Sequence, residues 1–346
     1  MEELSVIGLD LAKSVFQVHG SDSRGRVLFR KKLARRSVVD FFRSLAPCVV
    51  GMEACSSAHH WGRMLRSLGH DVRLIAPSYV KAYVKRGKTD AADAEAIAEA
   101  VSRPTMRFVP LKSEEEQAAL IRHKVRTLLI KQRTMLVNAL RGHLAEFGLV
   151  DARRRQGLTR LKEAFCATPA SVPADAHDAL QAIIVQIDQL DTRIIVLEKE
   201  IVARCRASAV CRRLMGIEGV GPISAHLIAG SVPDARVFAR SRDFAAWLGL
   251  TPKSHSTGGK ERLGRISKKG NEEIRRLLVQ GAAALLMHAN RAKTPRPSRL
   301  LDWVRRLIGQ NKPFKLVAVA LANKLARIVW AVMSRNEPYK AQPAHA

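Results

Sequence analysis

The 346-residue sequence predicts an α/β domain, a helical coiled-coil middle region and a mainly α-helical C-terminal domain. Short apolar strands alternate with helical segments over the first hundred residues, which is typical of a largely buried sheet covered by helices. After Pro110 the chain has long stretches of helix-forming residues, and from Cys211 onward most of it is helical again. We therefore divide the chain into residues 1–110, 111–208 and 209–346.

The N-terminal domain shows strand and helix signals in a regular order. Predicted strands fall within residues 5–20 (two strands joined by a turn), 24–32, 47–54 and 71–77. Predicted helices fall near 36–45, 56–70 and 89–103. Ser56 or Ser57 is expected to cap the second of these helices, Gly69 to end it, and Thr89 to cap the third.

The middle region combines a long amphipathic helix with a heptad pattern. The helix runs from Ser113 without Gly or Pro until Gly142. Spacings of seven and three connect the apolar residues Leu180, Ile183, Ile187, Leu190, Ile194, Leu197 and Ile201. Such a seam fits a coiled coil between chains, or a helical hairpin in which both helices of one chain pack together. Residues 146–176 connect the two helices.

The charge of the chain indicates a polyanionic partner. There are 59 Lys and Arg against 31 Asp and Glu, a net charge of +28, and residues 201–346 alone hold 27 basic and 8 acidic side chains. Nucleic acid fits best, because phosphate contacts by Lys or Arg release condensed counterions; a generally basic surface is the alternative. A hydrophobic content of 47% excludes a disordered tail. The lack of an uninterrupted apolar run of about 18 residues argues against a membrane protein.

The N-terminus and the cysteines predict a cytoplasmic protein. The opening MEELSVIGLD is acidic, unlike the cationic start of a signal peptide. The five cysteines include no CxxC pair, so we expect reduced thiols and no structural zinc site.

Four carboxylates form the strongest chemical signal. Asp10 and Glu53 each end a predicted strand, and Asp90 and Asp93 are one turn apart on the helix 89–103. Ligands of α/β sheets gather at the carboxyl ends of strands, so a helix across that edge would bring all four together. Such a cluster needs cations to stay ionised, which predicts hard divalent metal, and two ions would suit attack at a phosphodiester. Each residue alone could instead serve a turn or a helix terminus.

Three basic or Gly-rich segments are candidates for phosphate contacts. Lys85, Arg86 and Lys88 precede Asp90. The Gly219–Gly221 turn within IEGVGPISA resembles that of helix-hairpin-helix modules, with an ordinary helix–helix turn as the alternative. Residues 249–271 form a flexible loop or loose hairpin, in which the basic residues are Lys253, Lys260, Arg262, Arg265, Lys268 and Lys269.

The segments GLDLAK, GMEAC, KTDAADAEAIAEA, MGIEGVGPISA and GLTPKSHSTGGKERLGRISKKGN, in this order, resemble those of DEDD transposases of insertion sequences. The family is the one-ten family, in its sub-branch with an STGGK loop, which is related to Piv-type invertases. The resemblance covers nearly the whole chain. It implies a RuvC-like (RNase H-like) N-terminal fold, a coiled-coil middle and a C-terminal transposase domain with a catalytic serine. It also implies DNA recombination guided by an element-encoded bridge or seek RNA, in the bacterial cytoplasm on nucleoid DNA.

Matched residue by residue, the resemblance places the acidic tetrad on Asp10, Glu53, Asp90 and Asp93. These residues would bind Mg²⁺ or Mn²⁺. The serine falls on Ser256, or on Thr257 in an alignment without a gap, and we assign Ser256. Its hydroxyl would attack a DNA phosphate, giving a phosphoserine link whose 5′ or 3′ polarity the residues leave open. The coiled coil would join the acidic domain of one subunit to the serine domain of another in a dimer or tetramer.

The sequence is also compatible with three other functions. A RuvC-like Holliday-junction nuclease would share the carboxylates and leave the serine incidental. A site-specific DNA invertase of the same family would share both. A nucleic-acid-binding scaffold without catalysis would need neither Glu53 nor Mg²⁺, but binding alone does not require four carboxylates.

Overall fold

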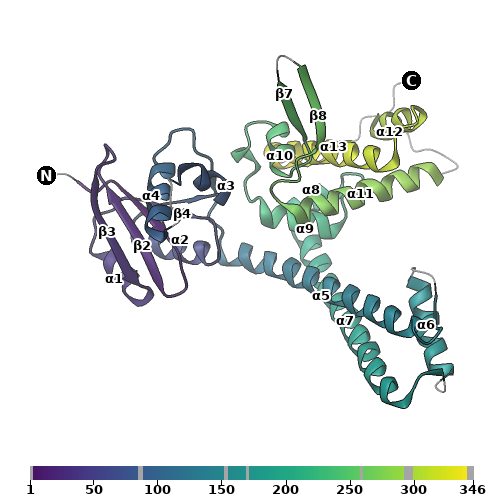
Figure 1. Cartoon of the computed structure of the whole chain (residues 1–346). Helices are drawn as coiled ribbons and strands as arrows, with labels where there is room; N and C mark the ends of the chain where they lie inside the picture. Colours follow the sequence, from purple (N-terminus) through teal and green to yellow (C-terminus); the bar gives the residue numbers. More distant parts are fainter. Residues whose placement is uncertain are drawn as a thin grey trace. The chain divides into compact units, whose positions relative to one another are not determined.

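The computed structural model describes residues 3–84, 89–151, 155–168, 171–257, 260–291 and 299–340. The chain forms two compact units, Met1–Gln117 and Ala118–Ala346 (Figure 1). The end of the first unit lies near the predicted boundary at residue 110. The predicted C-terminal domain and all but residues 111–117 of the predicted middle domain fall within the second unit, and the division into three domains stays a prediction.

A six-stranded mixed sheet organises the first unit, in the order β3-β2-β1-β4-β5-β6. The strands are β1 (Val6–Asp10), β2 (Val15–Ser21), β3 (Val27–Ala34), β4 (Val49–Glu53), β5 (Asp71–Ile75) and β6 (Phe108–Val109). β1, β4 and β5 are parallel neighbours, whereas β2, β3 and β6 each pair antiparallel. The sequence predicts the first five strands, and β6 has too few residues to show a pattern. This mixed sheet, followed by helical regions, is compatible with the expected RuvC-like fold.

Helices cover both faces of this sheet. They are η1 (Arg35–Ser37), α1 (Val38–Arg43), α2 (Ala58–Ser67), α3 (Pro77–Val80), η2 (Lys81–Tyr83) and α4 (Asp90–Val101). Because strand residues alternate between faces, Ile7 and Leu9 of β1 pack in the core with α1 and α2. On the other face, Ile97 and Val101 of α4 pack against Ile75 of β5.

Two of the three predicted helix signals have the expected geometry. The Thr89 hydroxyl caps α4 by accepting a hydrogen bond from the Ala92 N–H at 3.3 Å. Gly69 follows α2 with a φ of 95°, which favours glycine. Ser57 occupies the position before α2, but its side chain makes no capping hydrogen bond, since its backbone is left-handed with a φ of 70°.

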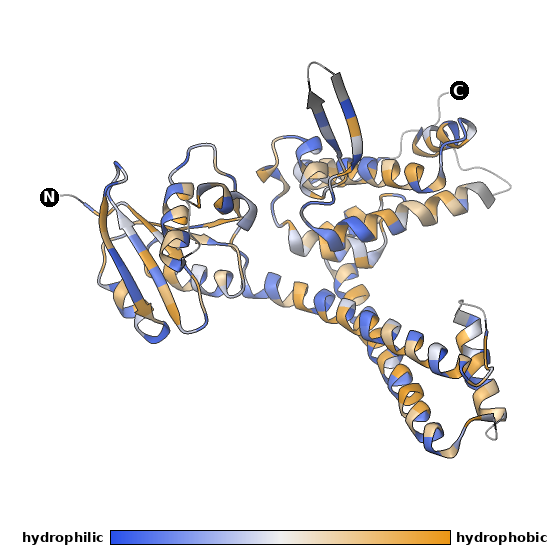
Figure 2. Cartoon of the chain, viewed as in Figure 1, coloured by the Kyte–Doolittle hydropathy of each residue, from blue (hydrophilic) through white to orange (hydrophobic). Residues whose placement is uncertain are grey.

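Two long helices and a short one open the second unit: α5 (Glu114–Ala145), α6 (Arg155–Ala167) and α7 (Ala174–Ala207). Hydrophobic and hydrophilic residues alternate along α5 and α7 (Figure 2). The first residues of each heptad, Leu180, Ile187, Ile194 and Ile201, are buried within this single chain. An ion pair between Arg126 of α5 and Glu198 of α7, at 2.8 Å, joins the two helices. Within this chain the packing corresponds to the helical hairpin, one of the two arrangements expected from the heptad pattern.

The connection between these helices contains α6, which the sequence analysis treats as a linker. Leu158, Leu161 and Phe165 of α6 are buried in one cluster with residues of α5 and α7. Their spacing of three and four residues is helical, but the flanking Arg- and Pro-rich segments obscure it.

The rest of the second unit forms one helical core with a β-hairpin. Its elements are α8 (Ala209–Met215), α9 (Pro222–Ser231), η4 (Ala235–Val237), α10 (Ser241–Trp247), β7 (Pro252–Thr257), β8 (Lys260–Ile266), α11 (Glu272–Arg291), α12 (Arg299–Gly309) and α13 (Phe314–Arg335). Phe244, Leu278 and Leu321 are fully buried where α10, α11 and α13 meet. The many helices agree with the mainly α-helical C-terminal domain expected from the sequence.

By length and composition, α13 is the one helix of the described residues that could cross a membrane. Its apolar residues Val317, Leu321, Leu325 and Val329 instead lie in the core of the second unit. We therefore interpret α13 as a core helix.

Candidate active site

Two parallel strands end side by side at the candidate site. β1 ends at Asp10 and β4 ends at Glu53, with Gly8 paired to Gly51 in parallel register. Because side chains alternate along a strand, Gly8 and Asp10 share one face of the sheet, as do Gly51 and Glu53. The face is the one covered by α4, because both glycines contact that helix.

The two glycines let α4 lie directly on the sheet. A Cβ atom at Gly8 would lie 2.1 Å from the carbonyl oxygen of Ala94, and one at Gly51 would lie 2.8 Å from Cβ of Val101. Contacts this short do not occur in packed proteins, so any larger residue would lift the helix. This close approach brings the first turn of α4 to the carboxyl ends of β1 and β4.

Three carboxylates converge there. Oxygen atoms of Asp10, Asp90 and Asp93 all lie within 4.8 Å of one another. Glu53 is not in that group of three, but its charge acts on Asp10 and the charge of Asp93 acts on it. The structure thus brings together the four acidic residues that the sequence analysis selects from three separate segments.

The electrostatics of the cluster show an excess of negative charge. The pKa of Asp10 is raised to about 6, first by burial and then by the charges of Asp93, Asp90 and Glu53. Burial and Asp93 also raise the pKa of Glu53. Among the described residues, no Lys or Arg forms an ion pair with these carboxylates. A set of oxygen donors without a counter-charge fits Mg²⁺ or Mn²⁺.

Cys55 lies beside the carboxylates, although no motif in the sequence points to it. Its backbone N–H donates to the carbonyl oxygen of Glu53 at 2.8 Å. Burial, and then the charges of Glu53 and Asp10, raise the pKa of its thiol, which keeps it protonated. A neutral thiol is a poor ligand for a hard cation, so the oxygen donors define the site.

Replacing Gly8 by Ala tests the close packing of α4. The added methyl group would overlap the Ala94 carbonyl, so we expect the unfolding free energy to fall by about 1–3 kcal/mol and divalent-metal affinity to fall with it. Urea denaturation and Mn²⁺ titration measure the two effects. Gly142→Ala is the control, because Gly142 is exposed on α5 with open space around it. Wild-type stability and metal affinity in Gly8→Ala would contradict the proposed role of this contact.

The predicted serine lies in the hairpin of β7 and β8. Ser256 pairs with Glu261, and Thr257 pairs with Lys260, so the serine and the threonine are the last two residues of β7. The side chains of Ser256, Thr257 and Lys260 lie outside the described part of the chain. The loose hairpin expected from the sequence is an antiparallel ribbon with a register shift between Pro252 and Ser254.

The base of this hairpin is fixed to the helical core. Arg275 of α11 donates hydrogen bonds to the carbonyl oxygens of Leu248 and Lys269 at 2.9 and 3.0 Å. A Cβ atom at Gly270, where φ is 75°, would lie 1.8 Å from the Trp247 carbonyl oxygen. Five of the predicted phosphate-binding residues of this segment are exposed: Lys253, Arg262, Arg265, Lys268 and Lys269. The hairpin is thus a basic ribbon held firmly at one end.

The glycine turn between α8 and α9 is closely packed. Gly219 has a φ of 83°, and a Cβ atom at Gly281 of α11 would lie 2.0 Å from its carbonyl oxygen. This packing accounts for a glycine at position 219, and the phosphate contact at Gly219 stays a prediction. Gly221 is exposed directly before the N-terminus of α9. The third predicted segment, Lys85, Arg86 and Lys88, lies outside the described residues.

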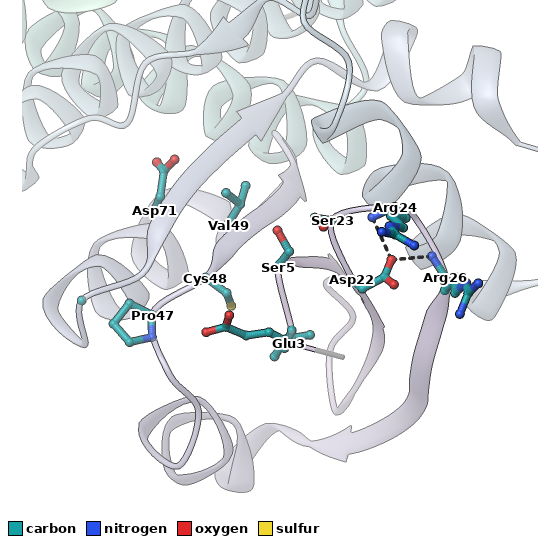
Figure 3. A pocket seen from close by; sticks show the side chains of 12 residues that line it. Glu3, Ser5, Asp22, Ser23, Arg24, Arg26, Pro47, Cys48, Val49 and Asp71 are labelled. Atoms are coloured by element: carbon teal, nitrogen blue, oxygen red, sulfur yellow. Dashed lines mark hydrogen bonds between the residues drawn. The ribbon is translucent and has the colours of Figure 1, made fainter. Parts of the chain in front are cut away.

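A pocket of about 810 Å³ lies at the opposite end of the same sheet (Figure 3). Its lining includes Ser5, Val49 and Asp71, where β1, β4 and β5 begin, and Asp22, which accepts hydrogen bonds from the N–H groups of Arg24 and Arg26 at 2.8 Å each. None of the four clustered carboxylates lines it. The pocket is therefore separate from the candidate site.

Comparisons with known proteins match both parts of this arrangement. A DEDD model of the IS110 type, described as "Transposase", matches residues 7–148, which include the four carboxylates. A second model, described as "Transposase IS116/IS110/IS902 family", matches residues 211–296, which include the hairpin.

Whole-length relatives extend the match over nearly the entire chain. A probable family 20 transposase of Pseudomonas aeruginosa is 52% identical over 339 residues, 97% of this chain and 99% of the relative. The transposase for insertion sequence element IS1111A of Coxiella burnetii is 39% identical over 98% of this chain and 92% of its own. A pilin gene-inverting protein of Moraxella bovis is 26% identical over 81% of this chain and 77% of its own length. The family inferred from the motifs is thus confirmed: the chain belongs to the IS110/IS116/IS902 family of DEDD transposases, enzymes that cut and join DNA strands in transposing insertion sequences.

Proposed function

We propose that this transposase cuts and rejoins DNA through Ser256, with divalent metal held by its four clustered carboxylates and with an element-encoded RNA selecting the DNA. The observation that carries the proposal is the convergence of Asp10, Asp90 and Asp93 within 4.8 Å, with Glu53 beside them. Such a protein works in the bacterial cytoplasm on the DNA of the nucleoid.

Each group has a defined part in the reaction. The Ser256 hydroxyl attacks a DNA phosphorus and loses its proton, a phosphorus–oxygen bond to serine forms, and the bond to a deoxyribose oxygen breaks. That oxygen leaves as a free hydroxyl after taking up a proton. Bound Mg²⁺ or Mn²⁺ would stabilise the charge that develops on the phosphate oxygens. Asp10, Glu53, Asp90 and Asp93 would hold the ion. Because the pKa of Asp10 is raised to about 6, protons would compete with the ion for this carboxylate below about pH 6.

The basic segments position the nucleic acid. The exposed residues of the hairpin contact phosphates, and so do Lys85, Arg86 and Lys88 before α4. The exposed N-terminus of α9 at Gly221 binds a further phosphate. The residues to which we assign these contacts are Lys85, Arg86, Lys88, Gly219, Gly221, Lys253, Lys260, Arg262, Arg265, Lys268 and Lys269.

A homo-oligomer, dimer or tetramer, completes the site by bringing the carboxylates of one subunit to the serine of another. The α7 heptad is used within the chain, but α5 exposes a second apolar stripe at helical spacing: Ile121, Val125, Leu128 and Met135. Exposed apolar residues that follow one another along a helix face are typical of a surface that packs against another chain, and Met135 is 70% exposed. Light scattering of the purified protein measures its mass, and a monomer would contradict this part of the proposal.

A site-specific DNA invertase is the second candidate. The relationship to the pilin gene-inverting protein favours it, although at 26% identity that relative is distant. Both candidates predict the same covalent chemistry and differ in the DNA that is rearranged.

Trapping of a covalent protein–DNA adduct tests the proposal. Labelled DNA carrying an element end is incubated with protein and Mg²⁺, with or without RNA transcribed from the non-coding DNA that flanks the gene. We expect an adduct that survives denaturation and depends on the RNA. Cleavage without any adduct would contradict the serine chemistry, and an equal yield without RNA would contradict the guidance.

A further inference from the structure

The helical pair α12–α13 is rich in Lys and Arg and has no acidic residue after Asp302. From Trp303 to Asn336 the chain has seven Lys and Arg and no Asp or Glu. Three of these cations lie where the two helices pack together: Arg306 of α12, and Lys324 and Arg327 of α13.

Lys324 is held by an aromatic ring instead of a carboxylate. Its Nζ atom lies 4.5 Å from the centre of the Trp303 ring, and its side chain is half-buried. Burial, followed by the positive charges of Arg306 and Arg327, lowers the pKa of Lys324. Arg306 and Arg327 are exposed, so the three cations repel one another at a surface that solvent reaches.

Arg305, the neighbour of Arg306 on α12, differs from the three cations because it has an acidic partner. Arg305 forms an ion pair with Asp302 at 2.8 Å. Within the described ranges, no ion pair joins Arg306, Lys324 or Arg327 to an acidic group. The stretches 292–298 and 341–346, outside those ranges, contain no Asp or Glu. An anion from outside this helical pair would relieve the repulsion.

We propose that Arg306, Lys324 and Arg327 bind the phosphodiester backbone of nucleic acid, with Trp303 fixing the ammonium group of Lys324. Phosphodiesters are the anions on which a transposase acts, and clustered cations contact them without reading bases. These residues are additional to the hairpin and the glycine turn. The inference rests on the proposed function only in taking DNA or RNA as the ligand.

Salt-dependent binding tests the site in the full-length protein without divalent metal. Affinities of wild type, Lys324→Gln and Arg327→Gln are measured for duplex DNA from an element end and for RNA from the flanking non-coding region. We expect each substitution to weaken binding roughly three- to ten-fold and to reduce the slope of log K against log salt by about 1. A loss with DNA alone, with RNA alone or with both supports the site and identifies its ligand.

Arg335→Gln is the matched control, because it removes one exposed charge from the same helix about 12 Å further along. Wild-type affinity and slope for both probes in Lys324→Gln and Arg327→Gln would overturn the proposal, as would an equal loss in Arg335→Gln. Arg327 is exposed, so Arg327→Gln stays informative if Lys324→Gln loosens α13, which thermal melting detects. Binding needs neither cleavage nor an adduct, so failure here is distinct from failure of the serine mechanism.

Discussion

Asp10→Asn is expected to reduce DNA cleavage roughly 1,000-fold while leaving the fold intact. The amide keeps the shape of the side chain but removes a half-buried charge of the acidic cluster. The pKa of Asp10 is raised to about 6 in the folded protein, compared with its usual value of 3.8. The wild-type carboxyl group therefore lowers the free energy of unfolding as the pH rises above 3.8. At pH 7 the metal-free variant should therefore melt at or above the temperature of the wild type. Cleavage assays in Mg²⁺ and thermal melting in EDTA measure the two effects.

Asp40→Asn is the control for this prediction. Asp40 is an exposed residue of α1 that pairs with Arg43 at 2.8 Å, and it lies outside the acidic cluster. Its substitution should leave cleavage within twofold of wild type. Normal cleavage by Asp10→Asn would show that the cluster is structural, and a strong loss of stability would leave the catalytic interpretation unsupported.

Ser256→Ala is expected to abolish the covalent adduct and strand transfer completely while nucleic-acid affinity stays within about twofold. The hydroxyl is the only group the change removes, and no other atom of that side chain can form the phosphoester. Ser254→Ala, on the same strand, should retain the adduct. Denaturing gels of labelled DNA and mobility shifts measure the two properties.

Thr257→Ala separates the two candidate nucleophiles. Retention of the adduct in Thr257→Ala, with loss in Ser256→Ala, supports our assignment. The reverse pattern would move the nucleophile to Thr257. Cleavage that survives in both variants without any adduct would instead indicate a RuvC-like Holliday-junction nuclease.

Much of the acidic site can be predicted from the sequence because its determinants are local. Asp10 and Glu53 follow apolar strands directly, and parallel strands present their carboxyl ends at one edge. Asp90 and Asp93 share a helix that Thr89 caps. The depth at which α4 packs is harder to predict, since Gly8 and Gly51 act through contacts with residues far away in the chain.

Other features depend on which elements meet in three dimensions. The α7 heptad shows an apolar face but not its partner, which here lies in α5 and α6 of the same chain. Short amphipathic helices such as α6 and α12 have too few turns to stand out from their basic surroundings. The cation cluster of Arg306, Lys324 and Arg327 exists only because α12 and α13 pack side by side.

Mn²⁺ in a crystal of the full-length protein, located by anomalous scattering, tests most directly whether the carboxylate cluster is a metal centre. We predict an anomalous peak in contact with Asp10, Asp90 and Asp93, and its loss in crystals of Asp93→Asn. Mn²⁺ bound elsewhere while these carboxylates stay without it at saturating concentration would contradict the metal-dependent mechanism.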